Sequence, residues 1–310
     1  MTDEQSARLE QVVGKLSLPS TSWRGMLRHF GPGLILMMTG VGTSHLVTAP
    51  TAGGRFEFAL LWCIPIAYIF KYYGFEMAFR FTNATGKSLI EAYGTAWKKW
   101  PLWYVMITTI IQSAIGQAGR LAAAAAVAYY LFTTTVGLPL SQTHYGFVLA
   151  VSAVAIILYG NYAAVEAATK ILAGMLVACT FLVFFFRPVG LDAFSHFFIF
   201  ETPAGSWLVI AAFLGLLPTG IDVSLQASEW GKAKKVGMGR IRPELERAGL
   251  VPVFDPFSSS KVDLAVDTSK IPAHGIEYCR RWFQIGLWDF RLGHVVSFML
   301  ATVFLLLAAT

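Results

Sequence analysis

Residues 31–62 read GPGLILMMTGVGTSHLVTAPTAGGRFEFALLW, and this apolar stretch decides the fold because it interrupts itself. Its centre, TGVGTSH from Thr39 to His45, places two glycines, three hydroxyl groups and an imidazole where a membrane-spanning helix would cross the middle of a bilayer. Lipid offers no hydrogen bonds to unpaired backbone groups, so an unwound stretch is tolerated there only when protein or a solvated cavity surrounds it. The stretch therefore predicts a broken transmembrane helix.

The composition predicts an integral membrane protein. Of the 310 residues, 55% are hydrophobic and only 14% are charged, whereas soluble domains average about 25% charged residues. The net charge of +6 does not indicate nucleic-acid binding, because the basic residues gather between alternate apolar segments. We therefore expect a lipid bilayer around the chain and no nucleic-acid partner.

Seven apolar segments are long enough to cross a hydrocarbon core of about 30 Å. Basic residues flank them unevenly, and most lie in the N-terminal tail and in the loops after the second, fourth and sixth segments. By the positive-inside rule, the N-terminus and the long sixth loop are expected in the cytoplasm. The segments cover residues 31–50, 57–79, 102–132, 146–160, 168–187, 206–228 and 292–310.

This pattern divides the chain into four parts. Residues 1–30 are expected to form a solvated cytoplasmic tail, and residues 31–230 the first six transmembrane helices. Residues 231–291 are expected to form a cytoplasmic loop interrupted by prolines, and residues 292–310 the seventh helix. The chain stops on apolar residues, LATVFLLLAAT, so we expect a C-terminally truncated fragment.

The tail has one alternative to a solvated leader. Its apolar residues recur at helical spacing, which also allows a short amphipathic helix. These residues are Leu9, Val12, Val13 and Leu16.

Several short motifs together resemble landmarks of the Nramp (natural resistance-associated macrophage protein) metal-ion transporters. The motifs keep the family's order over residues 28–230, and their specificity lies in the ensemble. The resemblance implies an all-α, leucine-transporter-like fold of two inverted five-helix repeats, whose first and sixth helices break around the substrate. The motifs are GPG at 31–33, TAGGRFEFALLW at 51–62, TGKSLIEAYG at 85–94, GLP at 137–139 and VEAATKILAGM at 165–175.

The chain departs from the family at the metal-binding positions. The family carries Asp-Pro-Gly-Asn at the first break, where this chain has Gly42-Thr43-Ser44-His45, and Met-Pro-His at the sixth, where it has Gly220-Ile221-Asp222. Third-helix carboxylates that the family uses for protons match apolar or basic positions from Arg120 to Ala124. The resemblance therefore implies the fold, while the family's metal chemistry and proton coupling do not carry over.

The two breaks still contain a set of polar groups that predicts a substrate site. An imidazole, a carboxylate and backbone carbonyls can bind manganese or iron, and the loss of a methionine ligand removes discrimination against magnesium. His45 and Asp222 are therefore the predicted metal ligands. The predicted substrate-binding residues are Gly42, Thr43, Ser44, His45, Thr219, Gly220 and Asp222.

Two other interpretations of the breaks remain open. His45 and Asp222 can form a purely structural ion pair, although ionisable groups inside a membrane are functional candidates by default. A small organic or anionic solute can also bind at the positive ends of the half-helices.

Three classes of function compete. A secondary transporter of a divalent cation or a small solute explains both breaks. A non-transporting receptor or scaffold leaves the breaks without a purpose, and the usual outside N-terminus of a seven-span receptor conflicts with the charge bias. A membrane-embedded enzyme needs a convergent nucleophile and base, which one histidine and one aspartate do not supply. We therefore expect no enzymatic activity and no cofactor.

Two further motifs have local interpretations. Glu76 and Arg80 stand four residues apart near a helix end, which predicts a surface ion pair. TNATGKS at 82–88 resembles the end of a phosphate-binding loop, but Phe81 occupies the position where that motif requires glycine. A turn followed by a helix start is expected there.

We predict that the long loop after the sixth segment faces the cytoplasm. Green fluorescent protein fused after Ser259 should fluoresce, because the flanking basic residues keep this loop inside. Alkaline phosphatase fused at the same residue should be inactive. An active phosphatase there would show that the helix count or the orientation is wrong.

Overall fold

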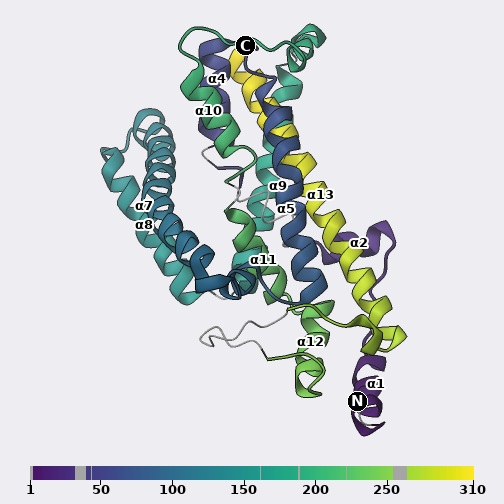
Figure 1. Ribbon diagram of the computed structural model, residues 1–310. Coiled ribbons are helices and arrows are strands. Elements are labelled where there is room, and N and C mark those ends of the chain that lie inside the picture. The colour runs from purple at the N-terminus through teal and green to yellow at the C-terminus, as the bar shows by residue number, and fades with distance from the viewer. Residues whose placement is uncertain are drawn as a thin grey trace. The chain divides into compact units, whose positions relative to one another are not determined.

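The computed structural model describes residues 3–31, 40–42, 44–160, 162–187, 189–220, 222–253 and 264–310. These residues form helices and no strand, which confirms the predicted all-α class (Figure 1). The chain divides into two compact units, each assembled from three separate segments. Unit 1 contains Met1–Met37, Ile69–Met106 and Gly220–Val296; unit 2 contains Met38–Tyr68, Ile107–Thr219 and Ser297–Thr310.

The described helices have this order along the chain. The α-helices are α1 (Asp3–Gly14), α2 (Trp23–His29), α4 (Ala49–Phe56), α5 (Cys63–Thr85), α6 (Leu89–Gly94), α7 (Trp100–Tyr129), α8 (Gln142–Tyr159), α9 (Tyr162–Phe186), α10 (Trp207–Leu216), α11 (Val223–Ala233), α12 (Met238–Arg247) and α13 (Ala273–Ala309). Shorter π and 3₁₀ turns are η1 (Ser44–Thr48), η2 (Trp97–Lys99), η3 (Tyr130–Thr135), η4 (Leu191–Phe197) and η5 (Thr268–Lys270).

Non-helical residues separate two helices in the sixth apolar segment, and the described part of the first segment contains a bend. In the sixth apolar segment, α10 ends at Leu216 and α11 begins only at Val223. In the first segment, Val41 and Gly42 form a bend, and the chain continues as η1 and α4. The second helix begins at Cys63 instead of residue 57, because Glu57 adopts a φ of 51° and residues 57–62 form turns.

Unit 2 has an apolar core made by α4, the start of α5, α10 and the end of α13. Gly53 allows α4 and α13 to approach closely, since a side chain there would collide with the carbonyl oxygen of Leu305. The core consists of Ala49, Ala52, Leu60, Leu61, Cys63, Ile64, Ala67, Tyr68, Ala193, Ile210, Phe213, Leu217, Ala301, Leu305 and Leu306.

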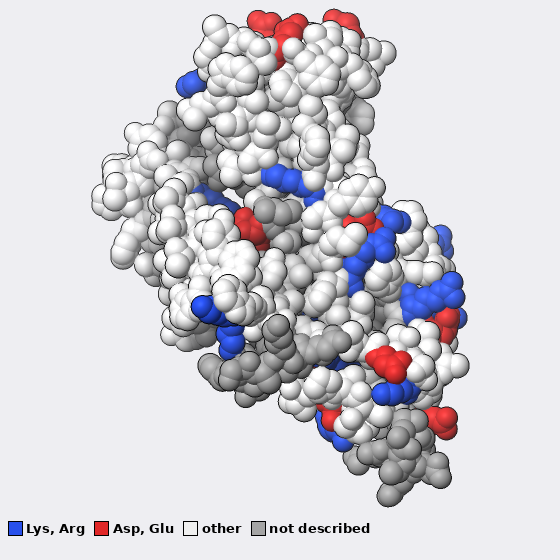
Figure 2. All heavy atoms as spheres, in the orientation of Figure 1, with Lys and Arg blue, Asp and Glu red and all other residues white. Residues whose placement is uncertain are grey.

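The α7 and α8 helices form an antiparallel pair that exposes large apolar side chains (Figure 1). Ile115, Phe147 and Ile157 are each at least 70% exposed, and the surface over this pair is almost free of charge (Figure 2). A continuous apolar surface of this kind suits lipid better than water. Among the described residues, α8 and α13 are both long and apolar enough to cross a membrane, fewer than the seven segments expected.

The start of the N-terminal tail packs one face against unit 1, whereas a solvated leader was expected. Residues 3–14 form α1, whose Leu9 and Val13 are buried in a cluster with Ile241 and Leu245 of α12 and Tyr278 of α13. The apolar face of α1 therefore packs against α12 and α13 within unit 1. The alternative interpretation, a short amphipathic helix, is the correct one for this segment.

The segment 231–291, expected as a loop, is largely helical in its described part. It contains the end of α11, all of α12 and η5, and the first half of α13, which begins at Ala273. Pro272 stands immediately before α13, where the missing N–H costs no helical hydrogen bond. Tyr278 and Ile285 are buried in unit 1, so packing stabilises this part of α13. The polar residues of the segment had instead favoured the prediction of a loop. The seventh helix accordingly starts well before residue 292.

A half-buried acidic residue, Glu91, stabilises the turn between α5 and α6. The Ser88 and Glu91 side chains form a capping box at the start of α6, and the Glu91 carboxylate lies 2.9 Å from Lys232 Nζ and 3.5 Å from Lys87 Nζ. Burial alone would raise the pKa of Glu91, but hydrogen bonds from Lys232 and from the backbone of Ser88 outweigh it and lower the pKa below its ordinary value. The charged form is therefore favoured by folding.

We predict that Glu91→Gln destabilises the protein in a pH-dependent manner. Glutamine keeps the capping bond but removes the charge, at a cost of roughly 1 to 3 kcal/mol at pH 7. Because the folded pKa lies below the unfolded value of about 4.3, this loss should vanish as the pH falls through the folded pKa. Thermal unfolding in detergent measures it, with the exposed Glu10→Gln as control. An equal loss at pH 7 and pH 3 would contradict the prediction.

Candidate functional site

The two interrupted helices meet at Gly40 in unit 2. A Cβ atom built on Gly40 would lie 2.7 Å from the Pro218 carbonyl oxygen and 3.1 Å from Thr219 Cβ. Both partners belong to the stretch that follows α10, and both are buried. A residue without a side chain is therefore required for the two breaks to touch, which explains one of the glycines in the TGVGTSH stretch.

Local hydrogen bonds satisfy the backbone at the first break. Gly42 N–H donates to the Gly40 carbonyl at 2.8 Å, and the Gly42 carbonyl accepts from His45 N–H at 3.1 Å and from Leu46 N–H at 2.8 Å. The Ser44 hydroxyl donates to the Gly40 carbonyl at 2.9 Å. A side chain thus supplies a bond that an uninterrupted helix would have made with its own backbone.

His45 is completely buried and both of its ring nitrogens are bonded. Nδ1 lies 2.8 Å from Ser44 Oγ. Nε2 lies 2.9 Å from Tyr68 Oη of α5 and 3.0 Å from Ser297 Oγ of α13. The two hydroxyls are in turn 2.7 Å apart. Four side chains therefore form one closed polar network inside unit 2.

The hydrogen bond that Ser44 donates favours one tautomer of His45. Ser44 gives its only hydroxyl proton to the Gly40 carbonyl, so its oxygen accepts from Nδ1–H of His45. Nε2 then acts as the acceptor and receives the hydroxyl proton of Tyr68 or Ser297. A neutral imidazole with the proton on Nδ1 suits Ser44 and the two hydroxyl groups, whereas the Ser297 carbonyl, 3.2 Å from Nε2, would accept only from a proton on that nitrogen.

The predicted residues of the second break divide between the units. Thr219 is buried and lies against Gly40 in unit 2. Gly220 and Asp222 belong to unit 1, where the Asp222 carboxylate turns back toward Gly220 at the start of α11 and makes no capping hydrogen bond. Asp222 attracts the ammonium group of Lys71 in α5. Thr43 lies outside the described residues.

The family model of natural resistance-associated macrophage protein-like proteins matches residues 33–229, which is more than half of the chain. This chain belongs to the Nramp family. The match confirms the resemblance found in the motifs, and it makes the chain part of an integral membrane family of metal-ion transporters.

One relative extends the similarity beyond the family match. This Nramp chain is 22% identical over 299 residues to an uncharacterized protein of Pasteurella multocida (strain Pm70), and the alignment covers 94% of the chain and 58% of that protein. The chain therefore spans less than two thirds of the length of the curated relative it matches.

Metal-ligand groups are sparse in the Nramp chain. The described residues contain no group of three or more histidine, cysteine, aspartate or glutamate side chains that could hold a metal ion. His45 has serine and tyrosine hydroxyls as neighbours in place of carboxylates. Any metal at this histidine would first have to displace a hydroxyl from Nε2.

Tyr68 and Ser297 are site residues that the sequence pattern did not single out. Each is a hydrogen-bonding side chain in an apolar helix, and that polarity was the only available signal. Their importance comes from their positions 23 and 252 residues away from His45 along the chain.

The predicted ion pair of Glu76 with Arg80 is present, but its placement at the surface is wrong for Glu76. Its side chain is only 4% exposed, and its carboxylate binds Arg80 at 2.9 Å and Arg291 of α13 at 3.5 Å. Arg291 also donates to Tyr72 Oη at 3.2 Å. The packing of α13 against α5 in unit 1 buries Glu76, and the second arginine offsets the cost of burying its charge.

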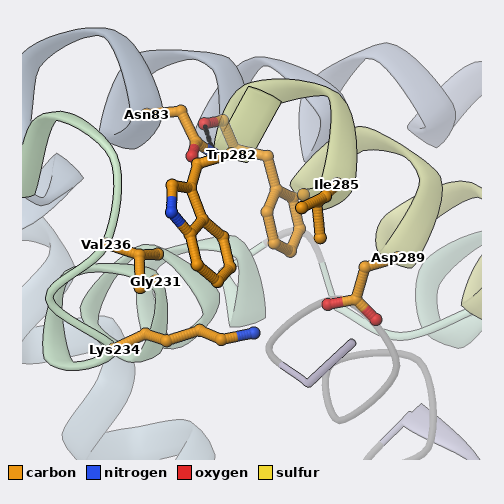
Figure 3. Close-up of a pocket in the computed structure, with 9 residues that line it drawn as sticks. Asn83, Gly231, Lys234, Val236, Trp282, Ile285 and Asp289 are labelled. Carbon is orange, nitrogen blue, oxygen red and sulfur yellow. Dashed lines mark hydrogen bonds between the residues drawn. The ribbon is translucent and has the colours of Figure 1, made fainter. Parts of the chain in front are cut away.

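A small pocket in unit 1 has a structural role. It has a volume of about 30 Å³, close to that of one water molecule, and lies beside Trp282 (Figure 3). Lys234 Nζ is 5.7 Å from the Trp282 ring centre and also donates to the carbonyl of His29. Asp289 accepts from the backbone N–H of Gly31 at 2.9 Å. These groups anchor the chain just before the first apolar segment.

We predict that Gly40→Ala destabilises the Nramp chain by about 1 to 3 kcal/mol, the usual cost of overpacking. The added methyl group would press on the Pro218 carbonyl and force the two breaks apart. Gly116→Ala in α7 is the matched control, because nothing lies within 4 Å of its Cβ position. Thermal unfolding in detergent compares the two variants. Equal stability of both would rule out the close contact at Gly40.

Proposed function

We propose that this Nramp chain, with its N-terminus in the cytoplasm, carries the substrate site of a secondary transporter at the two interrupted helices. The contact of Gly40 with Pro218 and Thr219, next to the buried His45 network, is the observation that carries the proposal. Interrupted helices expose carbonyls and helix ends, which a transporter uses to replace the water around its cargo.

The proposed cargo is a divalent cation such as manganese, iron or magnesium. His45 and Asp222 would supply an imidazole and a carboxylate, while Gly42, Thr219 and Gly220 would supply backbone carbonyls. Without the family's methionine, the site offers no soft ligand, so harder cations would bind better than in other members. Binding would use the Nε2 lone pair of His45 after the hydroxyls of Tyr68 and Ser297 rotate away.

A non-metal solute is the second candidate. It is favoured because both ring nitrogens of His45 already have hydrogen-bond partners. The network around this residue consists of hydroxyl groups and a neutral imidazole, which suit a small polar solute as well as a cation. The hydroxyls of Thr43 and Ser44 would then form hydrogen bonds to the cargo.

We predict that manganese binding separates these two candidates. If the cargo is a divalent cation, Mn²⁺ should bind the purified chain, and His45→Ala and Asp222→Asn should each weaken binding by about tenfold or more. Isothermal titration calorimetry in detergent measures the affinity. The exposed residues His144 and Asp192 provide matched controls as His144→Ala and Asp192→Asn.

The controls make the outcome decisive. Equal losses in the site variants and in the controls would reject His45 and Asp222 as ligands. Absence of Mn²⁺, Fe²⁺ and Mg²⁺ binding by a folded chain would reject the cation and leave the non-metal solute. Because His45→Ala removes a buried hydrogen-bonded group, His45→Asn is the second variant, and the circular dichroism of each must match that of the parent.

A further inference from the structure

A basic pocket lies in unit 1 where the turn after α5 meets α12. Its volume is about 370 Å³, within the range of about 300 to 1,000 Å³ typical of small-molecule sites. Gly86 makes the close approach possible, because a Cβ there would lie 2.9 Å from the Met238 carbonyl oxygen. The cationic side chains that line the pocket are Lys87, Lys232, Lys235, Arg240, Arg242 and Arg247.

Carboxylates neutralise only part of this positive charge. Glu91, Glu244 and Glu246 form the ion pairs of the pocket, so the cations outnumber them by two to one. Lys235 and Arg240 are exposed and take part in none of these pairs. The lining of the pocket therefore carries an excess of positive charge that an anion would neutralise.

Arg242 gives the pocket a rigid floor. Only 1% of this residue is exposed, its Nη1 donates to the carbonyls of Thr85 at 2.7 Å and Leu264 at 2.8 Å, and its Nε donates to Glu246 at 3.0 Å. Its Nη2 is buried and has no hydrogen-bond partner among the described residues, which leave out residues 254–263. A buried donor without a partner is costly, and an oxygen atom of a bound anion would satisfy it.

We propose that this pocket binds a phosphate group, carried either by a soluble phosphorylated molecule or by a phospholipid headgroup. A phosphate bears more charge than a carboxylate and accepts the paired N–H groups of arginine in a fixed geometry, while lysines add point charges around it. The pocket volume leaves room for more than the phosphate itself. The site is independent of the proposed transport site.

The binding experiment uses inorganic pyrophosphate and the purified full chain in an uncharged detergent. Calorimetry should show binding that weakens as salt rises, and the double variant Lys235→Glu, Arg240→Glu should weaken it at least about tenfold. These two side chains are exposed, so their replacement leaves the fold intact. The double variant Lys98→Glu, Lys99→Glu carries the same charge change outside the pocket and should bind like the parent.

Native mass spectrometry separates the two sources of the phosphate. The parent chain is offered phosphatidic acid or phosphatidylcholine in detergent. Preferential retention of phosphatidic acid that the pocket variant loses would identify a lipid headgroup. Pyrophosphate binding without such retention would identify a soluble ligand. If neither probe binds, or if the pocket variant and the control variant behave alike with both probes, the proposal is overturned.

Discussion

Every backbone N–H and carbonyl group at an interruption inside the membrane must find a partner within the protein, and the structure depends on this constraint. At the first break, Gly42 N–H and the Ser44 hydroxyl both bond to the Gly40 carbonyl. These groups of the break are therefore paired within the protein. The same bonds set the orientation of Ser44, whose hydroxyl oxygen lies 2.8 Å from Nδ1 of His45.

The α5 and α13 helices supply the remaining partners of the polar groups near the first break. In unit 2, Tyr68 and Ser297 close the network around the Nε2 atom of His45. In unit 1, Arg291 of α13 bonds to Glu76 and Tyr72 of α5. The packing of α5 against α13 therefore provides hydrogen-bond and ion-pair partners for His45, Glu76 and Tyr72.

The polar groups of unit 1 form ion pairs, whereas those around His45 in unit 2 form a network of hydroxyl groups and an imidazole. The carboxylates of unit 1 are held by lysine and arginine side chains at the turn after α5 and at α12, as in the pairs of Glu91 with Lys232 and Glu246 with Arg242. Charges of this kind cost little near water and much inside hydrocarbon. These charges lie in the segments that follow the second and sixth apolar stretches of the sequence.

The sequence by itself determined the helical class, the family and the two interruptions. Glycine, proline and hydroxyl residues change the backbone only within a few positions of where they stand. The interruption of a helix near Gly40 and near Pro218 could therefore be predicted from the sequence alone. Only the tertiary structure decided the partners of His45, the burial of Glu76, the helical state of residues 273–291 and the pocket around Arg242. Each of these depends on residues that stand far apart in the sequence, as Ser297 and His45 do at a separation of 252. Local patterns show which residues are apolar or helical, whereas the packing of helices determines which of them touch.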